Sequence, residues 1–272
     1  MRPVENKFTI SETTVLMPIG GKATRAREVT KDAIPKHLIP MGDEVIFDVV
    51  CRKLQSVGFR KFIFCVGHHS DKIRKHIKSA PWARGSIEYI FSEETSPLGV
   101  DGSVLNAITK LKLDGQGIII PGDMMFPWHE VRRMDDYHRL NNHDITISMT
   151  NNITKRSGDI GKMIVKNTKP NLLMKVYSRE ATNIDVPANA RALTCAAATS
   201  IDMKKYAAVC ADYLLNNPQH GSTPLSMRDY VAPWAVRASG HTIHTYELRG
   251  EILDLGTPSN IYYIQRNWRQ YA

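Results

Sequence analysis

Segments typical of buried strands alternate with segments typical of amphipathic helices through the first 150 residues, and this alternation restricts the fold more than any other feature. The strand-like runs are short and largely apolar, and the helix-like runs repeat apolar residues at three- and four-residue spacing. A βαβα order predicts the α/β class, with a mostly parallel sheet covered by helices. The expected strands are Thr13–Pro18, Lys61–Val66, Ser86–Phe91, Gly117–Pro121 and Asp144–Thr150, and the expected helices are Val45–Val57, Asp71–Ile77, Gly102–Leu111 and His129–Leu140.

The pattern changes from about Asn151, where the strand-like segments become shorter. No repeat and no Pro/Gly/Ser-rich linker separates the two parts, so we expect a single domain over residues 1–272, with halves of about 10–150 and 151–272. The expected strands of the second half are Lys162–Val165, Leu172–Tyr177, Arg191–Thr199, His241–Glu247 and Glu251–Leu255, and the expected helices are Asp202–Leu215, Met227–Ser239 and Ser259–Trp268.

A glycine pair and a group of cations follow the first expected strand. Gly20 and Gly21 allow the backbone to approach a ligand closely, and five cations come after them, at Lys22, Arg25, Arg27, Lys31 and Lys36. Like charges repel, so this cluster indicates an anionic partner such as a phosphate chain. The loop is neither G-x-G-x-x-G nor the usual P-loop. Ligands of open α/β sheets bind beyond the carboxyl ends of the strands, where Asp123 also lies, so both should meet in one crevice.

The composition limits which partners the protein can bind and which cellular compartment it can occupy. The net charge of +9 suits either an anionic ligand or a solvated basic surface. The basic residues between 72 and 78 follow a helical pattern with apolar residues inward, which argues against a nucleic-acid groove. The four cysteines are scattered without a C-x-x-C, so neither a zinc site nor a disulfide framework is indicated. Cys51 and Cys65 lie in apolar runs and are expected to be reduced core residues, which predicts a cytoplasmic location. No apolar run reaches the length of a membrane span and the first 12 residues are polar, so we expect neither a membrane partner nor a secretory signal.

The loop resembles the signature of the sugar-1-phosphate nucleotidyltransferases, or nucleotide-sugar pyrophosphorylases, in which G-G-x-G-T-R is followed by P-K. Ala23 stands where that family has its third glycine. Three later stretches also resemble family segments: S-P-L-G-V-D-G, P-G-D-M-M and L-D-L-G-T-P. The resemblance covers nearly the whole chain in the family's order. The matching signature residues are Gly20, Gly21, Thr24, Arg25, Pro35 and Lys36, and the later stretches add Gly99, Gly122, Asp123 and Asp254.

The resemblance implies a Rossmann-like three-layer αβα nucleotidyltransferase fold, with a mixed, mainly parallel sheet and a small sugar-binding subdomain. The first half would bind the nucleotide, and the second half would bind the sugar phosphate and close the site. The implied nucleotide-binding residues are Gly20, Gly21, Lys22, Gly99 and Gly122; the implied catalytic residues are Arg25 and Lys36; and Asp123 and Asp254 would bind Mg²⁺ as cofactor.

The sugar side departs from the family. An E-K pair whose lysine meets the sugar phosphate is replaced by Ser178-Arg179, so Arg179 is the candidate for that phosphate. Gly161 lies in G-D-I-G-K-M-I-V, which resembles the strand that enters the sugar half. Ala197 lies in an alanine triplet where the family has N-A-G, so an asparagine contact to a sugar hydroxyl is missing. An unusual sugar, a deoxy sugar or a cyclitol phosphate is therefore expected as acceptor.

The implied reaction joins a nucleoside triphosphate to a sugar 1-phosphate and releases pyrophosphate, with GTP slightly favoured over dTTP and UTP. Two alternatives stay open from the sequence. One is a cytidylyltransferase acting on phosphocholine or another non-sugar phosphate, and the other is a non-catalytic subunit that senses nucleotide sugars. A homo-oligomer is possible, and no nucleic-acid partner is expected.

Overall fold

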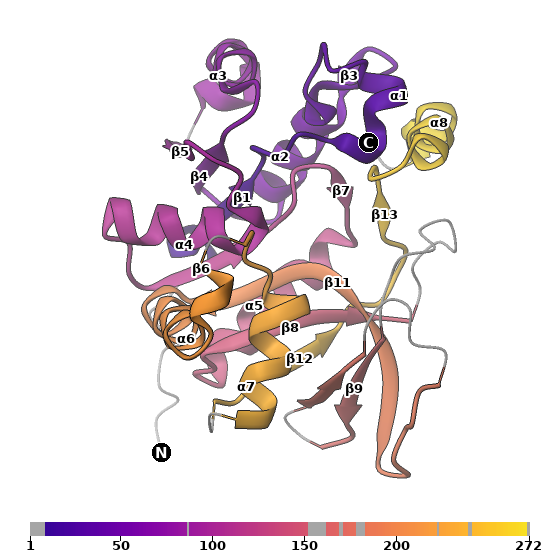
Figure 1. The fold of residues 1–272 in the computed structure, drawn as a ribbon. Helices are drawn as coiled ribbons and strands as arrows, with labels where there is room; N and C mark the ends of the chain where they lie inside the picture. Colours follow the sequence, from indigo (N-terminus) through magenta and orange to yellow (C-terminus); the bar gives the residue numbers. More distant parts are fainter. Residues whose placement is uncertain are drawn as a thin grey trace, which may run out of the picture.

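The computed structural model describes residues 9–85, 87–151, 162–168, 171–177, 183–221, 223–238 and 241–270. Figure 1 labels the main elements. The strands are β1 Thr14–Pro18, β2 Pro40–Met41, β3 Glu44–Val45, β4 Lys61–Val66, β5 Glu88–Glu93, β6 Gln116–Ile119, β7 Met124–Met125, β8 Ile145–Thr150, β9 Lys162–Lys166, β10 Leu172–Val176, β11 Ala190–Asp202, β12 His244–Glu247 and β13 Leu253–Asp254. The α-helices are α1 Arg27–Thr30, α2 Ile46–Ser56, α3 Ser70–Ser79, α4 Gly99–Leu111, α5 Trp128–Leu140, α6 Met203–Asn216, α7 Ala232–Ala238 and α8 Pro258–Asn267.

Strands from both halves of the chain form one nine-stranded sheet in the order β5-β4-β1-β6-β11-β8-β12-β10-β9. The expected mixed sheet is confirmed. Parallel pairing is found in β5-β4-β1-β6 and between β8 and β12. The 13-residue β11 runs antiparallel to β6, β8 and β9, and β10 runs antiparallel to β9 and β12. Parallel pairs therefore predominate only in the first half, where helical crossovers join the strands.

Helices cover both faces of this sheet and give it three layers (Figure 1). Val15 and Met17 of β1 face one hydrophobic core, which includes apolar residues of α2, α3 and α5. Leu16 faces the other core, with apolar residues of α4, α6 and α7. All three side chains are fully buried. A strand buried on both faces reads as a continuous apolar run, which explains why β1 could be recognised in the sequence.

Two expected elements differ from the structure in their details. The expected strand Glu251–Leu255 shortens to β13, whose partner is the two-residue β7 rather than the main sheet. The expected helix Met227–Ser239 begins as a π-helical turn over Met227–Val231 and continues as α7. The short β2–β3 hairpin was not expected, because two-residue strands leave no periodic signal.

Two exclusions made from the composition can be compared with the structure. All four cysteines are unpaired, and three of them are buried. Among the described parts of the chain, no helix is both long and apolar enough to cross a bilayer.

Candidate functional site

A cavity of about 290 Å³ opens beyond the ends of β1 and β6, where the two halves of the chain meet. Arg25 and Lys36 reach it from the loop after β1, Asp123 reaches it from the position just before β7, and Asp254 reaches it from β13. Ala197 reaches it from the middle of β11. The structure thus brings together five of the site residues predicted from sequence, although they lie as much as 229 positions apart.

The β7–β13 pair places the two carboxylates side by side. Asp254 is paired in register with Met124, and the amide of Leu255 donates to the carbonyl of Asp123 at 3.2 Å. Burial raises the pKa of Asp254, and the neighbouring negative charge of Asp123 raises it further. The amide of Gly256 donates to Asp254 Oδ1 at 2.7 Å and opposes this shift. Two adjacent carboxylates in a cavity are oxygen ligands of the kind that Mg²⁺ prefers.

Lys36 neutralises one of these carboxylates. Its Nζ lies 2.5 Å from Asp123 Oδ2, and only 6% of the Asp123 side chain is exposed. Burial, the largest single influence, raises the pKa of Asp123, but the charge of Lys36 and its hydrogen bond, together with smaller contributions, lower the pKa below its ordinary value. The next residue, His37, is buried with its Nε2 unpartnered in the described structure. Burial and the charge of Lys36 lower the pKa of His37 to about 3, so this ring is neutral beside the ion pair.

Arg25 lies close to Asp254 on the same side of the cavity. A Cβ built on Gly256 would come within 3.0 Å of both carboxylate oxygens of Asp254 and within 3.3 Å of Arg25 Nη2. A side chain at position 256 would therefore displace the Asp254 and Arg25 side chains by a few tenths of an ångström. The charge of Arg25 also opposes the rise in the pKa of Asp254.

The remaining cations of the loop lie elsewhere. Arg27 forms an exposed ion pair with Asp32 at 3.1 Å, and Lys22 and Lys31 are exposed. None of these three lines the cavity. The cationic group read from the sequence therefore divides into two residues that face the cavity and three that face solvent. Ala23, at the family's glycine position, adopts the left-handed conformation with φ 50°, which glycine adopts at lower cost.

The glycines predicted to bind nucleotide lie near the strand ends but outside the wall of this cavity. A Cβ on Gly20 would come 2.7 Å from the amide nitrogen of Gly67, and one on Gly122 would come 2.7 Å from Ile19. A Cβ on Gly99, whose φ is +79°, would come 2.7 Å from the carbonyl of Leu225. Close packing by itself requires glycine at these positions. Gly21, in contrast, borders open space and leaves room for a ligand.

Glu94 occupies the space between the Gly20 and Gly67 backbones, and sequence reasoning missed it. Its amide donates to the carbonyl of Val66 at 2.9 Å, so it lies just past β5 and beside the ends of β4 and β1. Its Oε1 would be 2.7–2.8 Å from a Cβ on either glycine. Burial raises the pKa of this half-buried carboxyl. Within the described chain it forms no ion pair, and its carboxylate accepts one weak hydrogen bond, from the Leu98 amide at 3.4 Å.

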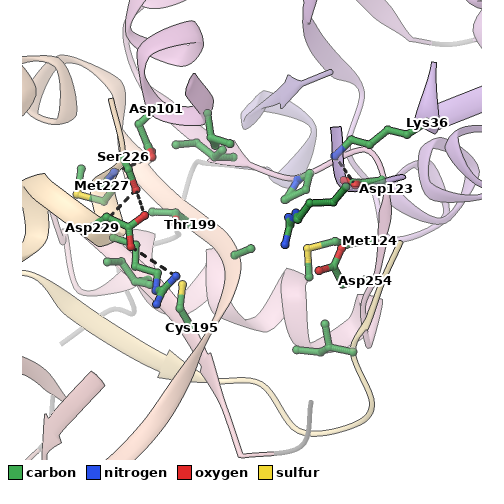
Figure 2. Close-up of a pocket in the computed structure, with 18 residues that line it drawn as sticks. Lys36, Asp101, Asp123, Met124, Cys195, Thr199, Ser226, Met227, Asp229 and Asp254 are labelled. Atoms are coloured by element: carbon green, nitrogen blue, oxygen red, sulfur yellow. Dashed lines mark hydrogen bonds and ion pairs between the residues drawn. The ribbon is translucent and has the colours of Figure 1, made fainter. Parts of the chain in front are cut away.

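The wall facing Asp123 and Asp254 was also missed. It contains Ser226, Met227 and Asp229 from the π-helical turn (Figure 2). Asp101 holds this segment, since its carboxylate accepts from the Met227 amide at 2.7 Å and from the Tyr206 hydroxyl at 2.8 Å. Ser226 to Asp229 carry no motif in the sequence, so only the packing against α4 reveals them.

The sugar-side predictions have different outcomes in the structure. Ala197 lines the cavity and has φ 66°, at an irregularity in the pairing of β11 with β8. Gly161 and Arg179 lie outside the described residues, so their assignments stay predictions.

Comparisons with known proteins identify the family of this chain. A family model described as nucleotidyl transferase matches residues 14–172, more than half of the chain. The chain belongs to the nucleotidyl transferase family. The resemblance to sugar-1-phosphate nucleotidyltransferases inferred from the loop motif is confirmed at this level.

Curated relatives and solved structures add detail. The mannose-1-phosphate guanylyltransferase catalytic subunit beta of Drosophila pseudoobscura pseudoobscura is 27% identical over 138 residues, which cover 51% of this chain and 37% of the relative. The mannose-1-phosphate guanyltransferase of Saccharomyces cerevisiae is 24% identical over 135 residues, or 50% of this chain and 37% of the relative. The alignments thus span little more than a third of these relatives.

Two solved structures share the fold along nearly the whole chain. UDP-glucose pyrophosphorylase from Acinetobacter baumannii superposes with a TM-score of 0.72 at 15% identity, covering 94% of this chain and 93% of the other. A UDP-glucose pyrophosphorylase complexed with UDP-glucose gives 0.73 at 12% identity, covering 96% and 99%. At these identities the likeness establishes the nucleotidyltransferase fold expected from the sequence.

Proposed function

We propose that this chain transfers a nucleotidyl group from a nucleoside triphosphate to a sugar 1-phosphate and releases pyrophosphate. The observation that carries this proposal is the convergence of Arg25, Lys36, Asp123 and Asp254 on one cavity at the strand ends. The acceptor phosphate attacks the α-phosphorus in line, so positioning and charge neutralisation supply most of the catalysis. The two relatives named as mannose-1-phosphate guanylyltransferases support a hexose phosphate as the first acceptor to try.

Each residue has a role that follows from its position. Arg25 steadies the leaving pyrophosphate, and Lys36 moves from Asp123 to the phosphates that exchange bonds. Asp123 and Asp254 would hold Mg²⁺, which when bound neutralises charge on the phosphates. The raised pKa of Asp254 supports this assignment, because burial and the adjacent negative charge of Asp123 both disfavour its ionised form, and a bound divalent cation would offset that cost.

GTP is the triphosphate that Glu94 favours. An ionised carboxylate only accepts hydrogen bonds, and guanine is the common base whose pairing edge presents two adjacent donors, N1–H and N2–H₂. The position of Glu94 beyond the ends of β1, β4 and β5 suits a base that sits beside Gly20. Glu94 therefore supports the slight preference for GTP inferred from the sequence.

Two claims, the proposed reaction and the preference for GTP, are tested by one assay. It measures pyrophosphate release from GTP, ATP, UTP, dTTP and CTP with mannose 1-phosphate. Glu94→Gln presents one donor and one acceptor, so kcat/KM for GTP should fall about 100-fold, and the preference should move toward UTP and dTTP. Glu93→Gln is the matched control, because Glu93 pairs with Arg74 at the surface. An unchanged base preference in Glu94→Gln would remove the guanine assignment without touching the proposed reaction.

The cellular location and the alternative acceptor are also part of this proposal. A cytoplasmic location agrees with the unpaired cysteines, and cell fractionation would check it. The alternative acceptor phosphocholine belongs in the same assay, together with CTP.

A further inference from the structure

Arg228 lies in the cavity wall that faces the two carboxylates. It is adjacent in sequence to Met227 and Asp229, which Figure 2 shows across the cavity from Asp123 and Asp254. Its side chain is 16% exposed. No family motif in the sequence includes it, and none of the roles proposed for Arg25, Lys36, Asp123 and Asp254 involves it.

One edge of the Arg228 guanidinium has no hydrogen-bond partner among the residues that the structure describes. Nη1 is 3.5 Å from Asp229 Oδ1, a long ion pair, whereas Nε and Nη2 are buried and have no hydrogen-bond partner in the described residues. Nε and Nη2 form one edge of the planar group, and their parallel N–H bonds match two oxygens of a phosphate or carboxylate. Buried donors without partners cost stability, so such groups are usually satisfied in native proteins.

The segment that carries Arg228 is held from several sides. Asp101 accepts from the Met227 amide, and the amide of Leu225 donates to the carbonyl of Leu98 at 2.8 Å. The hydroxyl of Ser226 donates to Asp229 Oδ2 at 2.9 Å, so this carboxylate is shared rather than committed to Arg228. The segment is a π-helical turn, a form that is rare and concentrated at functional sites. The arginine is thus fixed before any ligand arrives.

We propose that Arg228 binds an oxyanion of the acceptor substrate through its Nε–Nη2 edge. This inference rests on the proposed function and specifies its acceptor side. Two oxyanions could occupy the edge: the phosphate that attacks, or a second anionic group on the sugar. The oxyanion neutralises the guanidinium and supplies the two missing acceptors.

Three variants test this role. Arg228→Gln removes the charge and the two parallel N–H donors of the Nε–Nη2 edge, and Arg228→Lys keeps the charge but loses this pair of donors. Arg237→Gln is the matched control, because Arg237 lies exposed on α7 and donates to the carbonyl of Pro233. Steady-state kinetics with GTP would be measured for mannose 1-phosphate and mannose 1,6-bisphosphate, and calorimetry would measure the binding of each sugar phosphate alone.

The acceptor KM should rise about 100-fold in Arg228→Gln and less in Arg228→Lys, with the KM for GTP unchanged. A rise for both acceptors identifies the attacking phosphate, and a rise for the bisphosphate alone identifies a second anion. An acceptor KM and affinity equal to wild type in Arg228→Gln would overturn the proposal, as would a wild-type protein that binds neither sugar phosphate. If wild type binds a sugar phosphate through Arg228 but releases no pyrophosphate, the proposed reaction fails while this site stands.

Discussion

Replacing Lys36 by methionine should weaken the fold as well as stop the reaction. Methionine keeps the length of the side chain but removes the charge that lies 2.5 Å from Asp123. The carboxylate would then be buried next to Asp254 without its cation. Breaking a buried pair from one side costs about 3–5 kcal/mol. Because Lys36 is 23% exposed, we expect about 3 kcal/mol of lost unfolding free energy, the lower end of that range.

Urea unfolding at pH 7.5 without metal measures this loss, and two additions make the test specific. Asp123→Asn in the Lys36→Met background removes the uncompensated charge, so most of the stability should return while activity stays absent. Mg²⁺ should stabilise Lys36→Met more than wild type, because the ion replaces the missing charge. Equal stability of wild type and Lys36→Met, or no recovery in the double variant, would refute the assignment of a charge-compensated carboxylate pair.

Three further predictions concern single positions. Asp254→Asn should stabilise the metal-free protein by about 1 kcal/mol, because it removes one of two adjacent carboxylates, and it should lower kcat at least 100-fold. Thermal unfolding measures the first effect and pyrophosphate release measures the second. A destabilised variant would contradict the repulsion between Asp123 and Asp254. Ala23→Gly should raise the unfolding free energy by about 0.5 kcal/mol, because glycine adopts a φ of 50° at lower cost; a loss of stability would show that the loop is not strained. His138 is fully buried, and its pKa is lowered to about 3. Below pH 6.5 the His138 side chain is therefore protonated in the unfolded chain but stays neutral in the folded chain. The free energy of unfolding consequently falls as the pH falls. Between pH 6.5 and 5 this contributes about 2 kcal/mol, and parallel pH profiles for wild type and His138→Gln would rule it out.

Local pattern was sufficient for the elements whose burial is uniform. Lys61–Val66 was expected as a strand and is found as β4 with the same bounds, because a strand covered by helices on both faces is apolar throughout. The expected strand Glu251–Leu255 is longer than the observed β13. The reason is that β13 pairs with the two-residue β7, and the hydrogen bond from the Leu255 amide to the Asp123 carbonyl holds the two segments together. Such pairing depends on tertiary contacts that a single sequence does not show.

The residues of the candidate site also fall into two groups, those predicted from the sequence and those recognised only in the structure. Arg25, Lys36, Asp123 and Asp254 were predicted because they stand in short motifs that resemble family segments, and the structure places all four around one cavity. Glu94 and Arg228 were missed for a physical reason. The importance of each follows from what surrounds it, the backbones of two glycines for Glu94 and an unpaired edge in a cavity wall for Arg228. Burial without a partner is a property of the folded chain alone.

Pyrophosphate release is the measurement that tests the central claim most directly. Wild type and Lys36→Met would be compared in the presence of Mg²⁺, with each triphosphate and a panel of hexose, deoxyhexose, cyclitol and choline phosphates. We predict release by wild type, fastest with GTP and a sugar 1-phosphate, and at least a 100-fold lower rate in Lys36→Met. Release that persists in Lys36→Met, or no release by a wild-type protein that binds nucleotide, would contradict the account.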